Sequence, residues 1–232
     1  FSVSILRCSP LTISAIYLRL NKYGVSVTIK KNPMQLKKDF INIAWISAGY
    51  ILAGFFVTQL VVPLQNEFLP NITGFAALIY PIHGIRVIAA WMFGWRSVPY
   101  LLTANIVMVA FYHYVWPDTP AMGASLERIM SWMLTSVVAV TAIDLFKASG
   151  MKIGTGIAEI NADTWKQLLF VGFISSVLNS VGQSLIFSGQ IMPDEGRNVM
   201  IGFLVGDTSG TLLCFLSLLF LFRGYRWLTL KV

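Results

Sequence analysis

The sequence predicts an all-α membrane protein, a polytopic bundle of about six transmembrane helices. Of its 232 residues 56% are hydrophobic and only 12% are charged, and the mean hydropathy is +0.71. Soluble domains carry about 25% charged residues. Several apolar runs have about 20 residues, which is the length that a helix needs to cross the hydrocarbon core. Because these runs are continuous rather than short and alternating, helices are favoured over a β-barrel.

The six predicted spans are separated by loops that contain proline, glycine or charged residues. They lie at about 40–62, 72–94, 98–116, 129–146, 165–187 and 199–222. The predicted domains are a basic N-terminal segment at 1–39, the transmembrane domain at 40–223 and a short basic tail at 224–232. Because Met34 opens a basic stretch directly before the first span, we expect residues 1–33 to be either an upstream extension outside the native protein or the tail of a truncated segment.

The distribution of basic residues predicts the orientation of the bundle. Most of the 17 lysines and arginines lie before the first span, in alternate loops and after the last span. Only Arg128 and Arg197 lie on the other side, and Arg86 lies within a span. Cytoplasmic loops carry the excess of Lys and Arg, so we expect both termini in the cytoplasm and the chain in a plasma membrane, such as a bacterial inner membrane. No basic face is left over for nucleic acid.

Five polar or charged residues lie inside the predicted spans at similar depths. With a helical rise of about 1.5 Å per residue, His83, Asn179 and Asp207 lie roughly 12 Å from the outer ends of their spans. On the same scale, Arg86 and Asn105 lie roughly 16 Å from those ends. The five residues come from four spans, so we expect a polar layer near the middle of the bilayer.

This layer has both a functional and a structural interpretation. A charge at the centre of a membrane helix costs about 2.5–3.5 kcal/mol on insertion scales, which marks a candidate functional site. An ion pair between Arg86 and Asp207 would offset both costs, and His83 shares a helix face with Arg86. The alternative is that buried polar groups only hold helices together, which we favour for Asn105, Asn179 and Gln183.

Proline and glycine mark the expected bends and close contacts. Pro81 is expected to free a backbone carbonyl and kink the second span. Gly94 begins a tight turn between the second and third spans. The four-residue spacing of Gly202, Gly206 and Gly210 predicts a ridge along which another helix approaches closely.

The sequence gives no sign of an enzyme. It lacks the nucleophile-elbow, zinc-protease and nucleotide-loop motifs. Cys8 and Cys214 are far apart, and no Cys/His spacing suits a metal. We therefore expect no catalytic residue, no metal and no cofactor.

Two stretches resemble a known family. The first is Tyr80-Pro81-Ile82-His83-Gly84, followed by Gly94, Arg96, Pro99 and Asn105, and the second is Gly206-Asp207-Thr208-Ser209-Gly210. They resemble the signature helices of the first (MASE-type) family of membrane-associated sensor domains. The resemblance implies an integral membrane sensory module, and its matching positions are Pro81, Gly84, Gly94, Asn105, Asp207 and Gly210. Members of that family generally have more spans and are usually fused to a histidine kinase or a diguanylate cyclase.

Two functions are therefore expected as alternatives. The first is a sensor-like module whose polar layer binds a small or anionic ligand, or registers a protonation change, and signals to a cytoplasmic partner. The second is a small-solute transporter, or the substrate-binding membrane subunit of one, with an energising partner. A purely structural membrane subunit is a third. The bilayer is the partner common to all three.

Overall fold

A computed structural model describes residues 16–21, 24–29, 33–115, 125–151, 153, 162–192 and 194–229. The chain forms two units, Phe1–Ala44 and Trp45–Val232. In the first unit, strand β1 (Ile16–Asn21) pairs antiparallel with β2 (Gly24–Ile29). Most of the predicted extension at 1–33 lies outside the described residues.

The second unit is helical throughout its described residues, apart from short connections. Within the described residues, five helical stretches are long and apolar enough to cross a membrane, so the chain is a multi-pass membrane protein. The predicted all-α transmembrane bundle is confirmed. The elements are α1 (Pro33–Phe56), the π-helix η1 (Val57–Val61), α2 (Val62–Asn66), α3 (Pro70–Thr73), α4 (Ile82–Phe93), the 3-10 turn η2 (Gly94–Arg96), α5 (Ser97–Val115), α6 (Leu126–Ala148), α7 (Ala162–Ile186) and α8 (Gly196–Thr229).

The longest apolar stretch contains both α4 and α5 and folds back on itself. The Arg86 guanidinium on α4 contacts Tyr50, while the Tyr112 hydroxyl on α5 donates to the carbonyl of Ile51. A straight helix would place residues 86 and 112 about 39 Å apart, yet both contact adjacent residues of α1. The chain reverses at Gly94, whose φ of +54° is in the left-handed region that favours glycine. When α4 and α5 are counted as separate helices, the five apolar stretches of the described residues become six helical segments.

The predicted second span at 72–94 is wrong as a continuous helix. Only α3 and α4 are helical there, and residues 74–81 between them form no regular helix. We call residues 74–81 the unwound segment. Pro81 caps the start of α4, so it begins a helix instead of kinking one. Proline suits this place because a helix start has no use for the missing N–H group.

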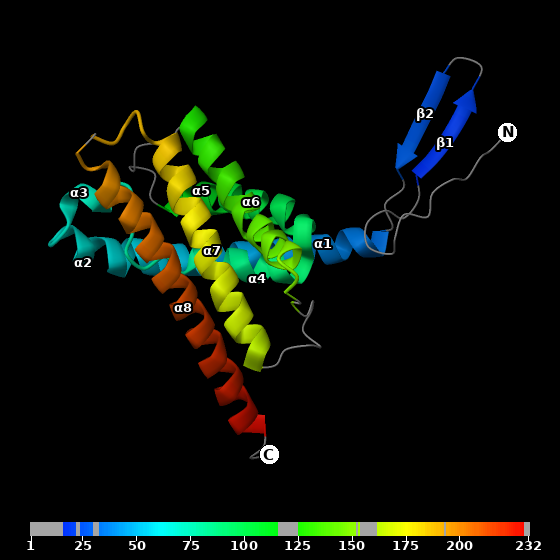
Figure 1. The fold of residues 1–232 in the computed structure, drawn as a ribbon. Coiled ribbons are helices and arrows are strands. Elements are labelled where there is room, and N and C mark those ends of the chain that lie inside the picture. Colours follow the sequence, from blue (N-terminus) through cyan, green and yellow to red (C-terminus); the bar gives the residue numbers. More distant parts are fainter. Residues whose placement is uncertain are drawn as a thin grey trace. The chain divides into compact units, whose positions relative to one another are not determined.

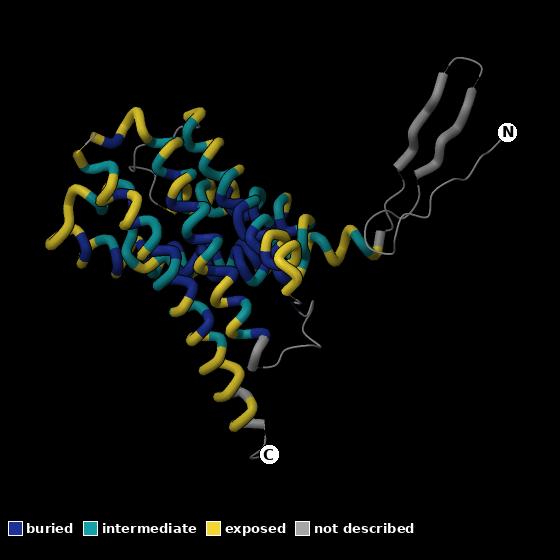
Figure 2. The backbone as a smooth tube through the Cα atoms, in the orientation of Figure 1, coloured by how far each residue is buried: buried dark blue, intermediate teal, exposed yellow. Residues whose placement is uncertain are grey.

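Helix α4 lies at the centre of the bundle, although it is only 12 residues long. Eight of those residues are buried, whereas the other helices expose apolar side chains on their outer faces, as lipid contact requires. Figure 2 shows the buried residues concentrated where the helices surround α4 (Figure 1). The apolar core joins four helices through residues that include Val87, Trp91, Val140, Ile143, Val171 and Phe215.

Helix α8 extends beyond the length of a span. Its 34 residues correspond to about 51 Å, against about 30 Å for the hydrocarbon core. The last described turns, which include Arg223 and Arg226, are exposed (Figure 2). The predicted tail at 224–232 is therefore helical up to Thr229, and residues 230–232 lie outside the described part.

The glycine ridge of α8 receives a segment of irregular backbone, not the helix that its spacing predicts. A Cβ on Gly206 would collide with the backbone of Ala77, and one on Gly210 with the backbone of Tyr80. Both neighbours belong to the unwound segment. Gly202, one turn earlier, instead faces the side chains of Ile72 and Ala76.

Replacing Gly210 by alanine should destabilise the bundle, because the methyl group meets backbone that cannot rotate away. Overpacking of this kind costs about 1–3 kcal/mol. Gly224→Ala on the same helix is the control, since a Cβ there meets nothing within 4 Å. Chemical unfolding in detergent measures both variants. Equal stability of the two would contradict the close approach.

Candidate functional site

The site is built around the unwound segment, four of whose backbone polar groups form hydrogen bonds with side chains or with α8. Gln65 on α2 acts as a clamp: its Nε2 donates to the carbonyl of Ala76 at 2.8 Å. Its Oε1 accepts from the backbone N–H of Leu78 at 2.7 Å. Backbone without helical hydrogen bonds is tolerated at membrane depth only where protein or water supplies partners. Gln65, which is buried, supplies two of them.

Helix α8 supplies two further partners across the glycine ridge. The N–H of Tyr80 donates to the carbonyl of Gly206 at 2.9 Å. The hydroxyl of Ser209 donates to the carbonyl of Leu78 at 2.5 Å. The lack of side chains at Gly206 and Gly210 is what lets the two backbones come within hydrogen-bond distance. This contact fixes the start of α4, and with it the positions of His83 and Arg86.

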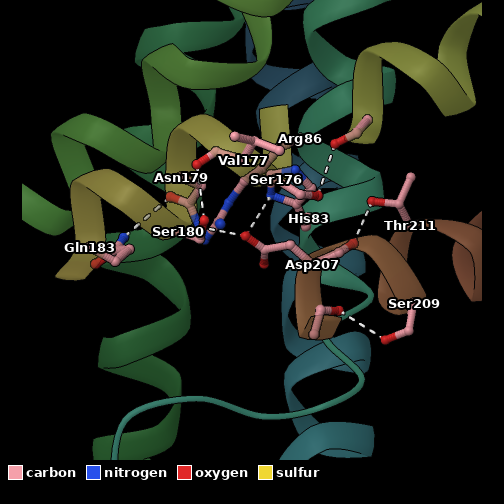
Figure 3. Close-up of polar contacts among 12 residues, drawn as sticks. His83, Arg86, Ser176, Val177, Asn179, Ser180, Gln183, Asp207, Ser209 and Thr211 are labelled. Carbon is pink, nitrogen blue, oxygen red and sulfur yellow. Dashed lines mark hydrogen bonds and ion pairs between the residues drawn. The ribbon is translucent and has the colours of Figure 1, made fainter. Parts of the chain in front are cut away.

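A buried polar cluster joins α4, α7 and α8 (Figure 3). Asp207 on α8 accepts a hydrogen bond of 2.5 Å from the side-chain amide of Asn179, and its Oδ2 lies 3.5 Å from Nδ1 of His83. Gln183 donates to Asn179 at 3.4 Å. His83 is completely buried, and neither ring nitrogen makes a well-aligned hydrogen bond within the described residues. His83 and Asp207 form a charge pair when the imidazole is protonated.

Arg86 does not form the predicted ion pair with Asp207. Its Nε donates to the Tyr50 hydroxyl at 3.2 Å, and its guanidinium lies over the rings of Tyr50 and Tyr80, 5.9 and 5.4 Å from their centroids. Two aromatic faces and one hydroxyl therefore stabilise the buried cation. The Asp207 carboxylate instead contacts Asn179 and His83. The charges of Arg86 and Asp207 therefore lie in one cluster without direct contact.

A cavity of about 230 Å³ adjoins this cluster. Its wall includes both charged members, Arg86 and Asp207, together with the amides of Asn179 and Gln183. The unwound segment, α6, α7 and α8 also contribute to the wall. Arg128, near the start of α6, adds a second guanidinium. Charged groups from distant parts of the sequence thus converge on one space large enough for a small molecule.

Three candidate residues have positions apart from this cavity. Asn105 is buried in α5, where its amide donates to the carbonyl of Leu101 in its own helix at 3.0 Å. Gly84 lies where α4 meets α8, and a Cβ there would collide with Cys214. Gly94 forms the reversal described above. The structure brings together His83, Arg86, Asn179 and Asp207, but not Asn105.

Sequence reasoning missed several residues of the site. Gln65 lies among exposed polar neighbours at a predicted loop, and nothing in its surroundings indicates a buried clamp. Tyr50 and Tyr80 resemble ordinary apolar residues of membrane spans. The position of Arg128 in the sequence indicates only that it belongs to the outer side. Each contributes through a partner far along the chain, which no local pattern reveals.

The side chains of the cluster are suited to hydrogen bonding and charge balance rather than to metal coordination. The described residues contain no group of three or more His, Cys, Asp or Glu side chains placed to hold a metal ion. The side chains available are guanidinium groups, amides, one imidazole and one carboxylate. These donate and accept hydrogen bonds and balance charge.

Comparison with known proteins finds no matching family model, curated protein or solved structure. The resemblance to the MASE-type sensor domains therefore stays a prediction that rests on the quoted residues.

Asn179 and Asp207 should show energetic coupling. Asn179→Ala and Asp207→Ala each remove one partner of the same buried bond, so their effects on the free energy of unfolding should differ from additivity by at least ~0.5 kcal/mol. Asn105→Ala is the matched control, because its amide bonds within its own helix, and with Asp207→Ala it should be additive. Additivity in both cycles would count against the contact.

Gln65→Ala should destabilise the protein by about 1–3 kcal/mol, because it leaves a buried carbonyl and a partly buried N–H without their partners. Gln190→Ala, at an exposed position, serves as the control. Unfolding monitored by tryptophan fluorescence measures both. A cost for Gln65→Ala no larger than the control's would show that the clamp is dispensable.

Proposed function

We propose that this chain is a ligand-binding membrane module of the sensor type. It binds a small molecule in the cavity beside Arg86 and Asp207 and passes the resulting helix movement to a cytoplasmic partner. The observation that carries the proposal is the convergence of buried charged and amide side chains on a cavity of about 230 Å³. A structural pair alone needs no space beside it, and buried charges inside a membrane bundle are costly to keep.

Helix α8 is the proposed transmitting element. It lines the cavity through Phe203 and Asp207 and continues without interruption to Thr229. A ligand that alters the contacts of Asp207 changes the position of a continuous helix. Because this helix exceeds the thickness of the hydrocarbon core, its last turns are available to a partner beyond the bilayer.

The predicted orientation puts the cavity in the outer half of the bundle. Arg128 lies near the start of α6 and Phe187 follows the end of α7, and both line the cavity. With both termini in the cytoplasm, these ends face outward. The proposed ligand therefore reaches the site from outside the cell, and the signal leaves at the inner side.

A transporter, or the substrate-binding subunit of one, is the second candidate, and the unwound segment favours it. Many transporters bind substrate beside a discontinuous membrane helix, where irregular backbone lines the site. Here Phe75, Ala77 and Tyr80 of the unwound segment line the cavity. Net movement of the ligand across the membrane distinguishes the two functions.

Ligand binding can be found by thermal unfolding of the detergent-purified protein against a panel of small metabolites and anions. We expect at least one compound to raise the unfolding temperature of the wild type. The effect should be lost in Arg86→Gln and kept in Arg197→Gln, a control basic residue outside the cavity wall. Absence of any shift would favour the purely structural function.

Transmission to α8 can be followed with its native cysteine. Cys214 lies against Gly84 at the contact between α4 and α8, and Cys8→Ser leaves it as the single thiol. We expect a bound ligand to change the rate at which a membrane-permeable maleimide labels Cys214. Uptake of the same compound into proteoliposomes would identify a transporter, whereas altered labelling without uptake supports a sensor.

A further inference from the structure

The charge balance of the cavity indicates the class of its ligand. Two arginines, Arg86 and Arg128, line it together with one carboxylate, that of Asp207, which leaves one net positive charge. Among the described residues neither arginine forms an ion pair, because the carboxylate contacts His83 and Asn179. With the His83 imidazole neutral, one negative charge from a ligand balances the charge of the wall.

The arginines also have hydrogen-bond donors to offer. Nη1 of Arg128 is buried and has no hydrogen-bond partner within the described residues. Arg86 uses its Nε on Tyr50 and has no other hydrogen bond in the described part of the chain. A guanidinium presents its donors in a planar fork that matches the two oxygens of a carboxylate. A buried donor without an acceptor is unfavourable, so an anion with two oxygens satisfies both charge and geometry.

The remaining wall indicates what the anion is attached to. Four aromatic residues surround the space: Phe75, Tyr80, Phe187 and Phe203. The amide oxygen of Gln183, a residue that is only 3% exposed, also lacks a hydrogen-bond partner among the described residues and accepts a donor on the ligand. Aromatic walls with a few placed polar groups are typical of sites for small organic molecules.

The size of the cavity limits the ligand. An apolar cavity of about 150 Å³ is large enough for benzene. The present cavity, at about 230 Å³, has room for a ring of that size and one carboxylate.

We infer that the cavity binds a small organic monocarboxylate with an apolar or aromatic body. Arg86 and Arg128 hold the carboxylate, and the aromatic residues enclose the body. This inference rests on the proposed function, because it names the ligand class of the same site.

Matched pairs of acids and amides test the inference. Acetate, benzoate and phenylacetate are compared with acetamide, benzamide and phenylacetamide, which have nearly the same shape but no charge. Affinity is measured by thermal shift and calorimetry on the protein in lipid nanodiscs. We expect benzoate and phenylacetate to bind at least tenfold more tightly than their amides, and acetate to bind more weakly because it leaves the aromatic wall unfilled.

Two arginine variants locate the carboxylate. Arg128→Gln should weaken benzoate binding at least tenfold, while Arg128→Lys should retain part of it. Arg128 is only partly buried, so its variants are expected to fold even if Arg86→Gln does not. Arg197→Gln controls for the loss of one positive charge outside the cavity, and the unfolding temperature without ligand controls for folding.

The outcomes separate the two proposals. Equal binding of acids and amides that depends on Arg86 overturns the monocarboxylate inference and leaves the proposed function standing. If none of the three carboxylates binds but another compound of the metabolite panel does, the monocarboxylate inference is likewise overturned and the proposed function stands. Failure of every compound overturns both. Benzoate binding that persists in Arg128→Gln and Arg86→Gln places the acid elsewhere and also overturns the inference.

Discussion

Hydrogen bonds from a side-chain clamp and from α8 hold the unwound segment inside the bundle, and the position of the site follows from them. In lipid every backbone polar group needs a partner, and residues 74–81 lack some of the hydrogen bonds of a regular helix. Gln65, Ser209 and the carbonyl of Gly206 replace them. This replacement is possible because two glycines let the α8 backbone approach. With the segment held, α4 begins directly after Pro81 in the centre of the bundle, which brings His83 and Arg86 beside α7 and α8.

The buried charges of Arg86 and Asp207 are not stabilised by a direct ion pair between them. Arg86 is stabilised by two tyrosine rings and a hydroxyl, and Asp207 by an amide and an imidazole. Each charge has neutral or titratable partners, so neither depends on the other for its burial. Such an arrangement keeps two charged groups beside a cavity without direct contact between them, and this is the observation on which the proposed function rests.

The bundle combines features that suit both signalling and transport. A discontinuous helix beside a polar cavity allows local rearrangement when a ligand binds. In the proposed function, α8, which lines the same cavity and is continuous to Thr229, would carry such a rearrangement to the far side of the membrane. The apolar core among α4, α6, α7 and α8 lies on the other part of α4, where packing holds the helices together. The site therefore adjoins the part of the structure that relies on hydrogen bonds, which are easier to rearrange than a packed core.

Hydropathy and the cost of buried charge act locally along the chain, so the membrane class, the helical bundle and a buried polar layer are all predictable from the residues alone. The same reasoning puts His83, Arg86, Asn179 and Asp207 at compatible depths. Which of them meet depends on how the helices pack. Asn105 shares the depth but bonds within its own helix, and Gln65 escapes prediction because its partners lie eleven and thirteen residues away on irregular backbone. The spacing of Gly206 and Gly210 predicts that another part of the chain packs closely against α8, but it does not predict which part. A glycine surface allows irregular backbone to approach as closely as a helix.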